Sequence, residues 1–516
     1  MREAVGAPAP ASRPGRGRRP GARESILDAI RAAEELSRVE LAKITGLTEA
    51  AVSMTVRRLI EEGLVVETGR TPTGGKPRTL LRLDPAARLA VGVHLDEDAT
   101  TYVLTGQTGG VISRLARPTP LGAALLATSR SAKPGPDAPT AAVPAAAVPA
   151  AAVPGAAVPG AAVPGAAVPG TAVPGTAVPG ADSFTASSSA SSSLPGSTSS
   201  GGDASPSSAL SGSDTLPGDA SSNGDVLPGD AQDAVLSALS ADIDVLLAGS
   251  GVDPARCLGV GIVWPGPHSG GTPADDLLPH LRGWHGDELG RRLSETTGWP
   301  VLVENDATAA AVGEYWVARV GPDRAFAALY MGGGIGAGIV IEGRAMRGSH
   351  ASAGEFGHLC LEVFGPECWC GSRGCLEVLA GPRTVVTAAR ADRVAAAEAG
   401  LDPAQPIRSV AADFGAVARA ARAGAPHCRA LLESSARYVA AATESMVNLL
   451  DIDLVVLTGP GFAAASAIYG PAITRRLAPA DSRTWHRDVT VTVSLAAATA
   501  SATGAAALVL QSHLRA

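Results

Sequence analysis

The chain has 516 residues, more than one compact core usually holds, so we expect two or three domains. Its formal charge of −7 is uneven: residues 1–82 contain 15 Lys and Arg against 10 Asp and Glu, and the remainder carries the acidic excess. A basic module on an acidic body predicts a polyanion partner for the small module only. No apolar run is long enough to span a membrane and no secretory signal opens the chain, so we expect a cytoplasmic protein.

The first part of the chain is expected to hold a disordered basic tail and a small helical module. Residues 1–22 are rich in Arg, Pro and Gly, and helical patterns follow over residues 24–35, 39–45 and 48–62. Thr48 suits the N-cap of the third helix, and Gly63 suits its end. Two strand-like runs then flank the basic, glycine-containing loop 69–78. This order predicts a helix–turn–helix with a β-wing over residues 23–84.

A second module, residues 89–516, begins with three short strands and is interrupted by a low-complexity insert at 120–229. Within the insert a Val-Pro step recurs every five residues, eight times between Val143 and Pro179, and a Ser/Gly/Asp-rich stretch follows. Such segments bury too little apolar surface to offset their ordering entropy, so we expect disorder. Beyond the insert, helical and strand patterns alternate to the C-terminus, with Ala-rich helices over 383–399, 408–422 and 425–450. The alternation predicts an α/β body with mixed sheets.

Four potential metal ligands lie close together in the body. His358, Cys368, Cys370 and Cys375 place one imidazole and three thiols within eighteen residues, although the chain has only six cysteines. A Cys3His set suits a structural, tetrahedral Zn²⁺ ion. Two buried thiols with a chance disulfide are the alternative, which a reducing compartment disfavours. The three other cysteines are expected to be small core residues, and they are Cys257, Cys360 and Cys428.

Several polar residues follow strands, where ligand sites of α/β folds usually form. Asn305 and Asp306 come directly after a strand-like run, Glu355 and His358 lead into the cysteine cluster, and Glu377 follows it. Paired carboxylates and amides are what a hydroxyl-rich ligand such as a sugar requires. The zinc ion would fix the orientation of the His358 ring. Taken singly, each acidic residue would be interpreted as a helix cap or a solvated surface group, and only their combination indicates a ligand site.

These segments together resemble the ROK family of repressors and sugar kinases. The resemblance rests on residues 303–311 (VENDATAAA), 332–338 (GGGIGAG), 353–358 (AGEFGH) and 368–377 (CWCGSRGCLE), with supporting matches at 264–267 and 281–284. It implies an actin/hexokinase-like, ribonuclease H-like body with two lobes and a sugar between them. It also implies that the sugar contacts are Asn305, Asp306, Glu355, His358 and Glu377, and that Asp306 matches the catalytic base of the family's kinases.

The phosphate-binding segments favour a regulator over a kinase. Kinases of the family carry an Asp-x-Gly-Gly-Thr hairpin after the first strand, whereas residues 93–101 here read VHLDEDATT. Asp96, Glu97 and Asp98 would place three carboxylates beside a polyphosphate, and non-glycine residues hinder close approach of the backbone. In the second loop Gly333 replaces the usual threonine. We therefore expect no enzymatic activity, with a zinc-containing, ATP-dependent sugar kinase as the alternative.

The N-terminal module resembles the winged helix-turn-helix that precedes the body in the family's regulators. Helix 48–62 would then be the recognition helix, with its outward residues near base edges and basic side chains on phosphate or in the minor groove. A solvated helical face with a flexible basic loop is the alternative. The expected DNA contacts are Glu49, Ala50, Ser53, Met54, Arg57, Arg58, Arg70, Lys76 and Arg78.

The sequence therefore predicts a sugar-responsive transcriptional regulator, most simply a repressor of carbohydrate genes. Its expected partners are a double-stranded DNA operator, a sugar or sugar-phosphate effector, and further copies of itself in a homodimer or homotetramer. The effector would shift the population of the conformation that binds DNA. Regulation by a protein partner instead of a small molecule stays open. The residue pattern does not identify the sugar.

Overall fold

The computed structural model describes residues 21–71, 77–119, 229–264, 286–318, 320, 324–407, 409–478 and 488–515. The expected basic tail up to residue 20, the insert from 120 to 228 and the motifs at 265–267 and 281–284 lie outside these residues, as does Lys76. Among the helices that are described, none combines the length and the apolar character needed to cross a membrane.

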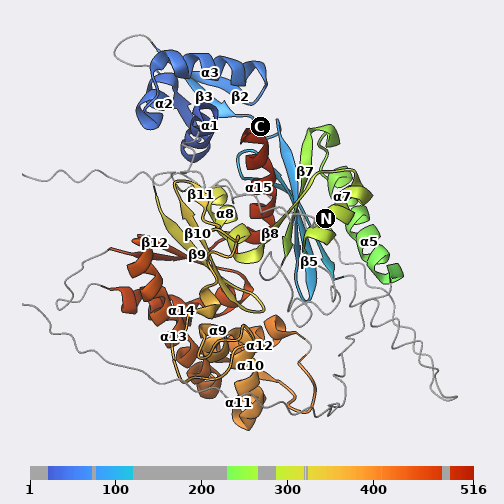
Figure 1. Ribbon diagram of the computed structural model, residues 1–516, viewed down its shortest axis with the longest axis vertical. Helices are drawn as coiled ribbons and strands as arrows, with labels where there is room; N and C mark the ends of the chain where they lie inside the picture. The colour runs from blue at the N-terminus through green and yellow to red at the C-terminus, as the bar shows by residue number, and fades with distance from the viewer. Residues whose placement is uncertain are drawn as a thin grey trace, which may run out of the picture. The chain divides into compact units, whose positions relative to one another are not determined.

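The N-terminal module is a three-helix unit with a small antiparallel sheet (Figure 1). Ser37 and Glu40 form a capping box at the second helix, and Thr48 caps the third, as expected. Val52, Val56 and Leu59 are fully buried on the inner face of the third helix. The elements are α1 (Ala22–Ala33), β1 (Glu35–Ser37), α2 (Arg38–Thr45), α3 (Glu49–Glu61), β2 (Val65–Thr71) and β3 (Arg78–Leu83), with sheet order β1-β3-β2.

The body contains two five-stranded sheets with the same topology. In each sheet three consecutive strands pair antiparallel and two later strands add in parallel next to the first of them. The repeated 3-2-1-4-5 order is the two-lobed, actin-like arrangement that was expected from the family resemblance. The first sheet, in the order β6-β5-β4-β7-β8, contains β4 (Leu89–Leu95), β5 (Ala99–Gly106), β6 (Val111–Pro118), β7 (Cys257–Trp264) and β8 (Val301–Asn305). The second, in the order β11-β10-β9-β12-β13, contains β9 (Phe326–Met331), β10 (Ile335–Ile341), β11 (Arg344–Ala345), β12 (Leu454–Thr458) and β13 (Thr490–Val493).

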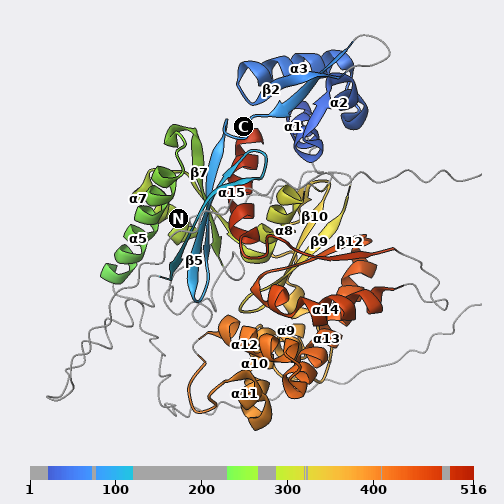
Figure 2. The ribbon, with the colours of Figure 1, turned by 180° about the vertical axis from the view of Figure 1, so that it is seen from behind.

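Two helices, α8 (Asp306–Val317) and α15 (Ala500–Arg515), lie side by side between the sheets, as both ribbon views show (Figures 1 and 2). Helix α15 packs on β4 and β7, while α8 packs on β9 and β10. Glycines allow the close crossing of the two helices: a Cβ atom on Gly504 would lie 1.6 Å from the carbonyl oxygen of Ala309. Any larger residue there would push the helices, and with them the lobes, apart.

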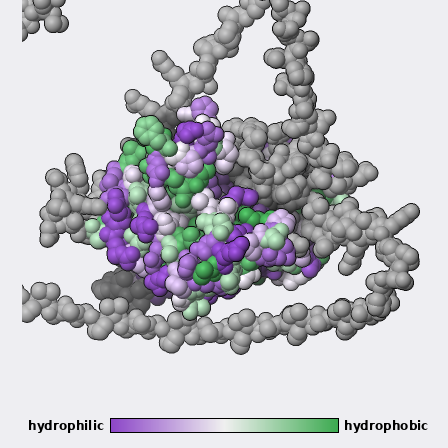
Figure 3. Space-filling model, turned by 90° about the horizontal axis from the view of Figure 1, so that it is seen from below, coloured by the Kyte–Doolittle hydropathy of each residue, from purple (hydrophilic) through white to green (hydrophobic). Residues whose placement is uncertain are grey.

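The remaining helices cover the outer faces of the sheets. Two cover the first sheet, α5 (Gly229–Gly249) and α7 (Gly286–Thr297), and a single 3-10 turn (Pro254–Arg256) precedes β7. The second lobe carries a larger helical layer, whose exposed face mixes hydrophilic and hydrophobic residues (Figure 3). Its elements are the 3-10 turn η3 (Phe356–His358), α9 (Leu376–Ala380), α10 (Pro382–Ala391), α11 (Arg393–Ala399), α12 (Val410–Arg422), α13 (Pro426–Leu450) and α14 (Pro460–Leu477).

Two expectations about this lobe are wrong. The helix expected over 383–399 is two helices, because the Asp392 side chain accepts hydrogen bonds from the N–H groups of Val394 and Ala395 and so starts a second helix. Cys360 is exposed and is not a core residue, since its backbone pairs with that of Cys375 along the surface loop of the cysteine cluster. Cys257 and Cys428 are buried, as expected.

Candidate functional site

The turn from β8 into α8 presents Asn305 and Asp306. Asn305 is the N-cap of α8, and its Oδ1 accepts hydrogen bonds from the N–H groups of Ala307 and Thr308 at 3.0 and 3.1 Å. Asp306 is the first residue of the helix, and its Oδ1 accepts from the Ala307 N–H at 2.7 Å. Burial raises the pKa of Asp306 to about 7, and the charges of Asp96 and Glu355 act in the same direction. The two carboxylates that raise this pKa come from other segments, so the structure brings these acidic groups together.

Glu355 lies on a loop that passes very close to β10. Gly354, with φ +95°, makes this approach possible, because a Cβ atom there would lie 2.0 Å from the carbonyl oxygen of Ala337. Glu355 itself is exposed, and the single turn Phe356–His358 that follows directs the chain toward the cysteine loop. A backbone that only glycine adopts therefore positions both predicted contacts of this segment, Glu355 and His358.

Glu377, in the first turn of α9, supports the glycine-rich hairpin between β9 and β10. Its Oε2 accepts a hydrogen bond from the Ile335 N–H at 2.8 Å, and a Cβ atom on Gly334 would lie 3.2 Å from the same oxygen. Burial raises the pKa of Glu377 to about 7, and the charge of Asp306 adds to the shift. One oxygen of this carboxylate is thus occupied by a hydrogen bond to the protein backbone. A side chain at Gly334 would crowd that oxygen, so the glycine keeps the space beside it open.

Sequence reasoning missed two polar residues that meet between the lobes. The hydroxyl of Tyr330, at the end of β9, lies 3.4 Å from Nε2 of His94 on β4. Burial lowers the pKa of His94. Burial also raises the pKa of Tyr330, and the charges of Asp96 and Asp306 contribute. The pair therefore belongs to the same cluster as Asp306, although 236 residues separate its members. The only signal in the sequence is a histidine within an otherwise apolar strand.

The four predicted metal ligands converge. One side-chain donor atom from each of His358, Cys368, Cys370 and Cys375 lies within 4.8 Å of all the others. The Cys368 Sγ lies 3.6 Å from the His358 Nδ1, and the Cys370 Sγ lies 3.7 Å from the Cys375 Sγ. Bonds of ~2.3 Å to sulfur and ~2.0 Å to nitrogen give ligand separations of this size around a tetrahedral ion. Burial lowers the pKa of His358, which favours the neutral ring that a metal ion requires. The residues can hold a metal ion.

Two family models match the chain, each over one of these structural regions. A model described as ROK family matches residues 231–512, and one described as MarR family matches residues 25–76. The first match covers more than half of the chain. The chain belongs to the ROK family.

Curated relatives include both regulators and kinases. The chain is 29% identical over 211 residues to a xylose repressor of Caldicellulosiruptor bescii, covering 40% of this chain and 50% of the repressor. It is 36% identical over 126 residues to a glucokinase of Thermotoga maritima, covering 24% of this chain and 40% of the kinase. The chain thus spans about half or less of the length of these relatives. A solved ROK family transcriptional regulator, described as a homologue of the E. coli MLC protein, has a TM-score of 0.53 and 18% identity, covering 96% of this chain and all of that one. That likeness shows the fold.

The turn between β4 and β5 of this ROK chain carries the three carboxylates expected from the sequence. Two of them bind the second lobe: the Ser409 hydroxyl donates to Asp98 at 2.6 Å, and the Val410 N–H donates to Glu97 at 2.8 Å. Ser409 is the N-cap of α12, so the turn joins the N-terminal end of that helix. Burial raises the pKa of Glu97, with Asp96 and Asp98 adding to the shift. The β4–β5 turn of the first lobe is thus acidic, and two hydrogen bonds join it to the start of α12.

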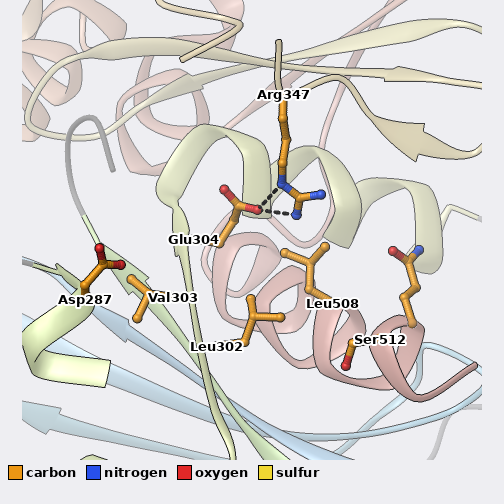
Figure 4. A pocket seen from close by; sticks show the side chains of 8 residues that line it. Asp287, Leu302, Val303, Glu304, Arg347, Leu508 and Ser512 are labelled. Carbon is orange, nitrogen blue, oxygen red and sulfur yellow. Dashed lines mark hydrogen bonds and ion pairs between the residues drawn. The ribbon is translucent and has the colours of Figure 1, made fainter. Parts of the chain in front are cut away.

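A pocket of about 360 Å³ is lined by residues of β8 and α15 and by Arg347 (Figure 4). Its centre is an ion pair between Glu304, which is 2% exposed, and Arg347, whose Nε donates to Glu304 at 3.0 Å. The side chain of Glu304 also accepts from the N–H of Asn305. The ion pair therefore holds the turn that presents Asn305 and Asp306. Sequence reasoning quoted Glu304 only as part of a motif and missed Arg347.

The MarR-like module presents its predicted DNA-binding residues on α3 and at the base of the wing. Glu49, Ala50, Met54, Arg57 and Arg58 are exposed, and Ser53 is partly buried. Arg70 and Arg78 are exposed where β2 and β3 lead into the wing. Val52, Val56 and Leu59 are buried on the opposite side of the helix, so α3 presents the predicted DNA-binding face to solvent.

Proposed function

We propose that the protein is a sugar-responsive transcriptional regulator, a repressor of carbohydrate metabolism genes that acts in the cytoplasm. One observation carries the proposal: a winged helix-turn-helix and a ROK body occur in one chain, and the β4–β5 turn, where the resemblance places the phosphate hairpin of the family's kinases, is acidic and joined to α12. Phosphoryl transfer needs N–H groups and Mg²⁺ around the nucleotide phosphates. Carboxylates at that turn oppose nucleotide binding and leave ligand sensing as the use of the residues around Asp306.

The effector is a sugar bound by Asn305, Asp306, Glu355, His358 and Glu377. These residues come from three separate segments. The charge of Glu355 raises the pKa of Asp306, and the charge of Asp306 raises the pKa of Glu377, which supports their closeness. Carboxylates accept hydrogen bonds from pairs of sugar hydroxyls, which gives both affinity and orientation. A homodimer would place two α3 helices about one DNA turn apart on a palindromic operator.

The metal ion is Zn²⁺, in a structural role. Three thiols and one imidazole are soft and borderline ligands that suit zinc, and four protein ligands complete its tetrahedron. Because His358 faces the cluster through Nδ1, its Nε2 is the ring atom left to address a sugar. The ion would thereby set both the tautomer and the direction of the ring.

We expect the full-length protein to shift a DNA fragment taken from upstream of its own gene, and a suitable sugar to change that affinity. Arg57→Ala should weaken operator binding by about 1–3 kcal/mol, roughly 5- to 150-fold, because the exposed guanidinium lies on the predicted base-reading face. Arg393→Ala removes an exposed arginine from α11 of the body and should leave operator affinity unchanged. Fluorescence anisotropy with specific and scrambled DNA measures the operator affinity of each variant. Absence of operator binding, or of any sugar effect across a broad panel, would refute the proposal.

We also expect an unphosphorylated sugar to bind at least about tenfold more tightly than its 6-phosphate. Like charges a few ångströms apart repel by roughly 1–4 kcal/mol, depending on solvent exposure, and a phosphate would meet the carboxylates of Asp96, Asp306 and Glu355. Isothermal titration calorimetry with matched pairs, such as glucose and glucose 6-phosphate, measures the difference.

Asp96→Asn tests the cause of that preference. The substitution removes one charge while keeping an oxygen that can accept from the Glu97 N–H, as Asp96 Oδ1 does at 2.8 Å. It should narrow the gap between the free and the phosphorylated sugar, whereas Asp402→Asn, at an exposed carboxylate of the second lobe, should not. Preference for the phosphorylated sugar in the unmodified protein would show that the acidic groups do not select the ligand.

A sugar kinase is the second candidate, and Asp306 favours it. A buried carboxyl group with a pKa of about 7 is suited to accept a proton from a sugar hydroxyl. Glucokinases are among the relatives of the chain. ATP-dependent phosphorylation of a sugar that disappears in Asp306→Asn would establish this function.

A further inference from the structure

An arginine of the DNA-binding module is buried against the ROK body. Arg31, near the end of α1, is 3% exposed, and its Nη1 donates to the backbone carbonyl of Tyr315 at 3.1 Å. The guanidinium carbon lies 4.3 Å from the centre of the Tyr315 ring and 5.1 Å from that of Trp316. Its only ion-pair partner among the described residues is Asp28, at 3.7 Å on the same helix. We call Arg31, Tyr315 and Trp316 the arginine socket.

The socket and the proposed sugar site lie at opposite ends of one helix. Helix α8 begins at Asp306 and ends at Val317, so Tyr315 and Trp316 belong to its last turn. Nine residues at ~1.5 Å each place Asp306 and Tyr315 about 14 Å apart along the helix axis. The hydrogen-bonded backbone of α8 is continuous between these ends, so it connects a displacement of the N-terminal end with the socket.

The neighbouring helix reinforces this connection. The Ser501 hydroxyl, in the first turn of α15, donates to the Asp306 carbonyl at 3.2 Å, and the two helices cross closely at Gly313 and Gly504. At the other end of α15, the His513 carbonyl accepts from Arg88, which directly precedes β4 and follows the DNA-binding module. The two helices thus form a packed unit that touches the sugar site at one end and the first module at the other.

The surroundings of the socket allow a change of position. A pocket of about 230 Å³ adjoins Arg31 and is lined also by Ile30, Arg82 and Thr108. Two further contacts join the module to the body nearby: Arg344 binds Glu24 at 2.8 Å, and the Gln107 side chain donates to the carbonyls of Leu64 and Asp84. Packed interfaces change between discrete arrangements, and open space beside a buried side chain permits a second one.

We propose that the arginine socket is the interface through which the DNA-binding module senses whether the cleft holds a sugar, with α8 as the connecting element. This proposal rests on the proposed function and specifies how the sugar site regulates DNA binding. Sugar at Asp306 changes the position of α8, the rings of Tyr315 and Trp316 move with it, and Arg31 carries the change into α1. The contacts of Arg31 that carry the coupling free energy between sugar and DNA are its two cation–π contacts and its one hydrogen bond.

The test uses the full chain with Arg31→Met and Arg31→Lys. Met keeps the apolar stem and the helix but removes the charge, whereas Lys keeps the charge and loses the planar group that stacks on both rings. Each variant should bind sugar within about twofold of the unmodified protein in calorimetry. The change in operator affinity that sugar causes, typically 5- to 150-fold in coupled systems, should fall to about twofold or less. Thermal unfolding shows whether each variant is folded.

Arg38→Met is the matched control, because Arg38 lies in the same module but pairs with Glu67 at 3.0 Å on the exposed side. It should keep the full sugar effect on operator binding. A full sugar effect in both Arg31 variants would overturn the inference and leave the proposed function standing. Absence of any sugar effect in the unmodified protein would overturn the proposed function and the inference together.

Discussion

Replacing Cys370 by serine is expected to remove the metal ion and to abolish the sugar response while the chain still folds. Cys370 Sγ lies 3.7 Å from Cys375 Sγ in the four-residue cluster, and serine oxygen is a poor substitute for a thiolate ligand of zinc. Without the ion, His358 loses the bond that fixes its ring. The loop between Glu355 and Glu377 also loses the metal cross-link that holds its two ends together. We expect metal content to fall from about one equivalent to near zero, and sugar affinity to fall at least roughly tenfold.

Cys360→Ser is the control for this experiment. Cys360 lies on the same loop and is exposed, and its backbone pairs with Cys375, yet its thiol is not part of the four-atom cluster. Its substitution should leave metal content, melting temperature and sugar affinity unchanged. Elemental analysis with calorimetry on the three proteins gives the answer. Full metal content and an unchanged sugar response in Cys370→Ser would contradict the assignment of the cluster as a structural zinc site.

Contacts between residues that are close in the sequence could be predicted, whereas contacts between residues that are far apart in the sequence could not. The cysteine cluster could be predicted because His358 to Cys375 span a short loop, whose closure brings the donors together at low entropic cost. The hydroxyl of Ser409 on the Asp98 carboxylate joins residues 311 positions apart, and Tyr330 meets His94 across 236 positions. Such pairs depend on how the two lobes pack, which local periodicity does not encode.

Local sequence was also misleading at Asp392, and it gave no prediction for α14. Asp392 lies in an Ala-rich run whose helical pattern continues on both sides, so the break that its side-chain cap creates was not expected. The helix α14, Pro460–Leu477, has no clear apolar periodicity, because Phe462, Tyr469 and Ile473 are buried among many alanines. Small residues are what allow close helix packing in this protein, and the same residues blur the pattern from which helices are predicted.

The arginine socket illustrates a limit of reading residues singly. Arg31 lies in the first helix of a basic module, where a DNA-facing role would be the natural interpretation, yet it is buried against aromatic rings of the body. Tyr315 and Trp316 likewise read as ordinary core residues at the end of a helix that begins with Asp306. Only their contact shows that α8 joins the two halves of the proposed regulator.

Replacing Asp306 by asparagine is expected to raise stability above neutral pH and to abolish sugar binding. Burial raises the pKa of Asp306 to about 7 from an ordinary value near 4, so the folded state favours the protonated carboxyl. Below pH 4 both states are protonated and the group has no effect. Between pH 4 and 7 the unfolded state ionises first, and the free energy of unfolding falls by at most ~1.4 kcal/mol per pH unit.

Asparagine cannot ionise, and its Oδ1 can still accept from the Ala307 N–H, so this loss should disappear. The variant should match the unmodified protein at pH 4 and exceed it at pH 8 by up to a few kcal/mol, as urea unfolding at the two pH values would show. Glu377, whose pKa is also raised to about 7, retains its own pH dependence in both proteins. Asp253→Asn, at an exposed residue that keeps its role as a cap, should alter neither stability nor sugar affinity. A variant that is less stable than the unmodified protein at pH 8 would show that the ionised Asp306 does not lower the stability of the folded state. A variant that binds sugar normally would show that Asp306 is not a sugar contact.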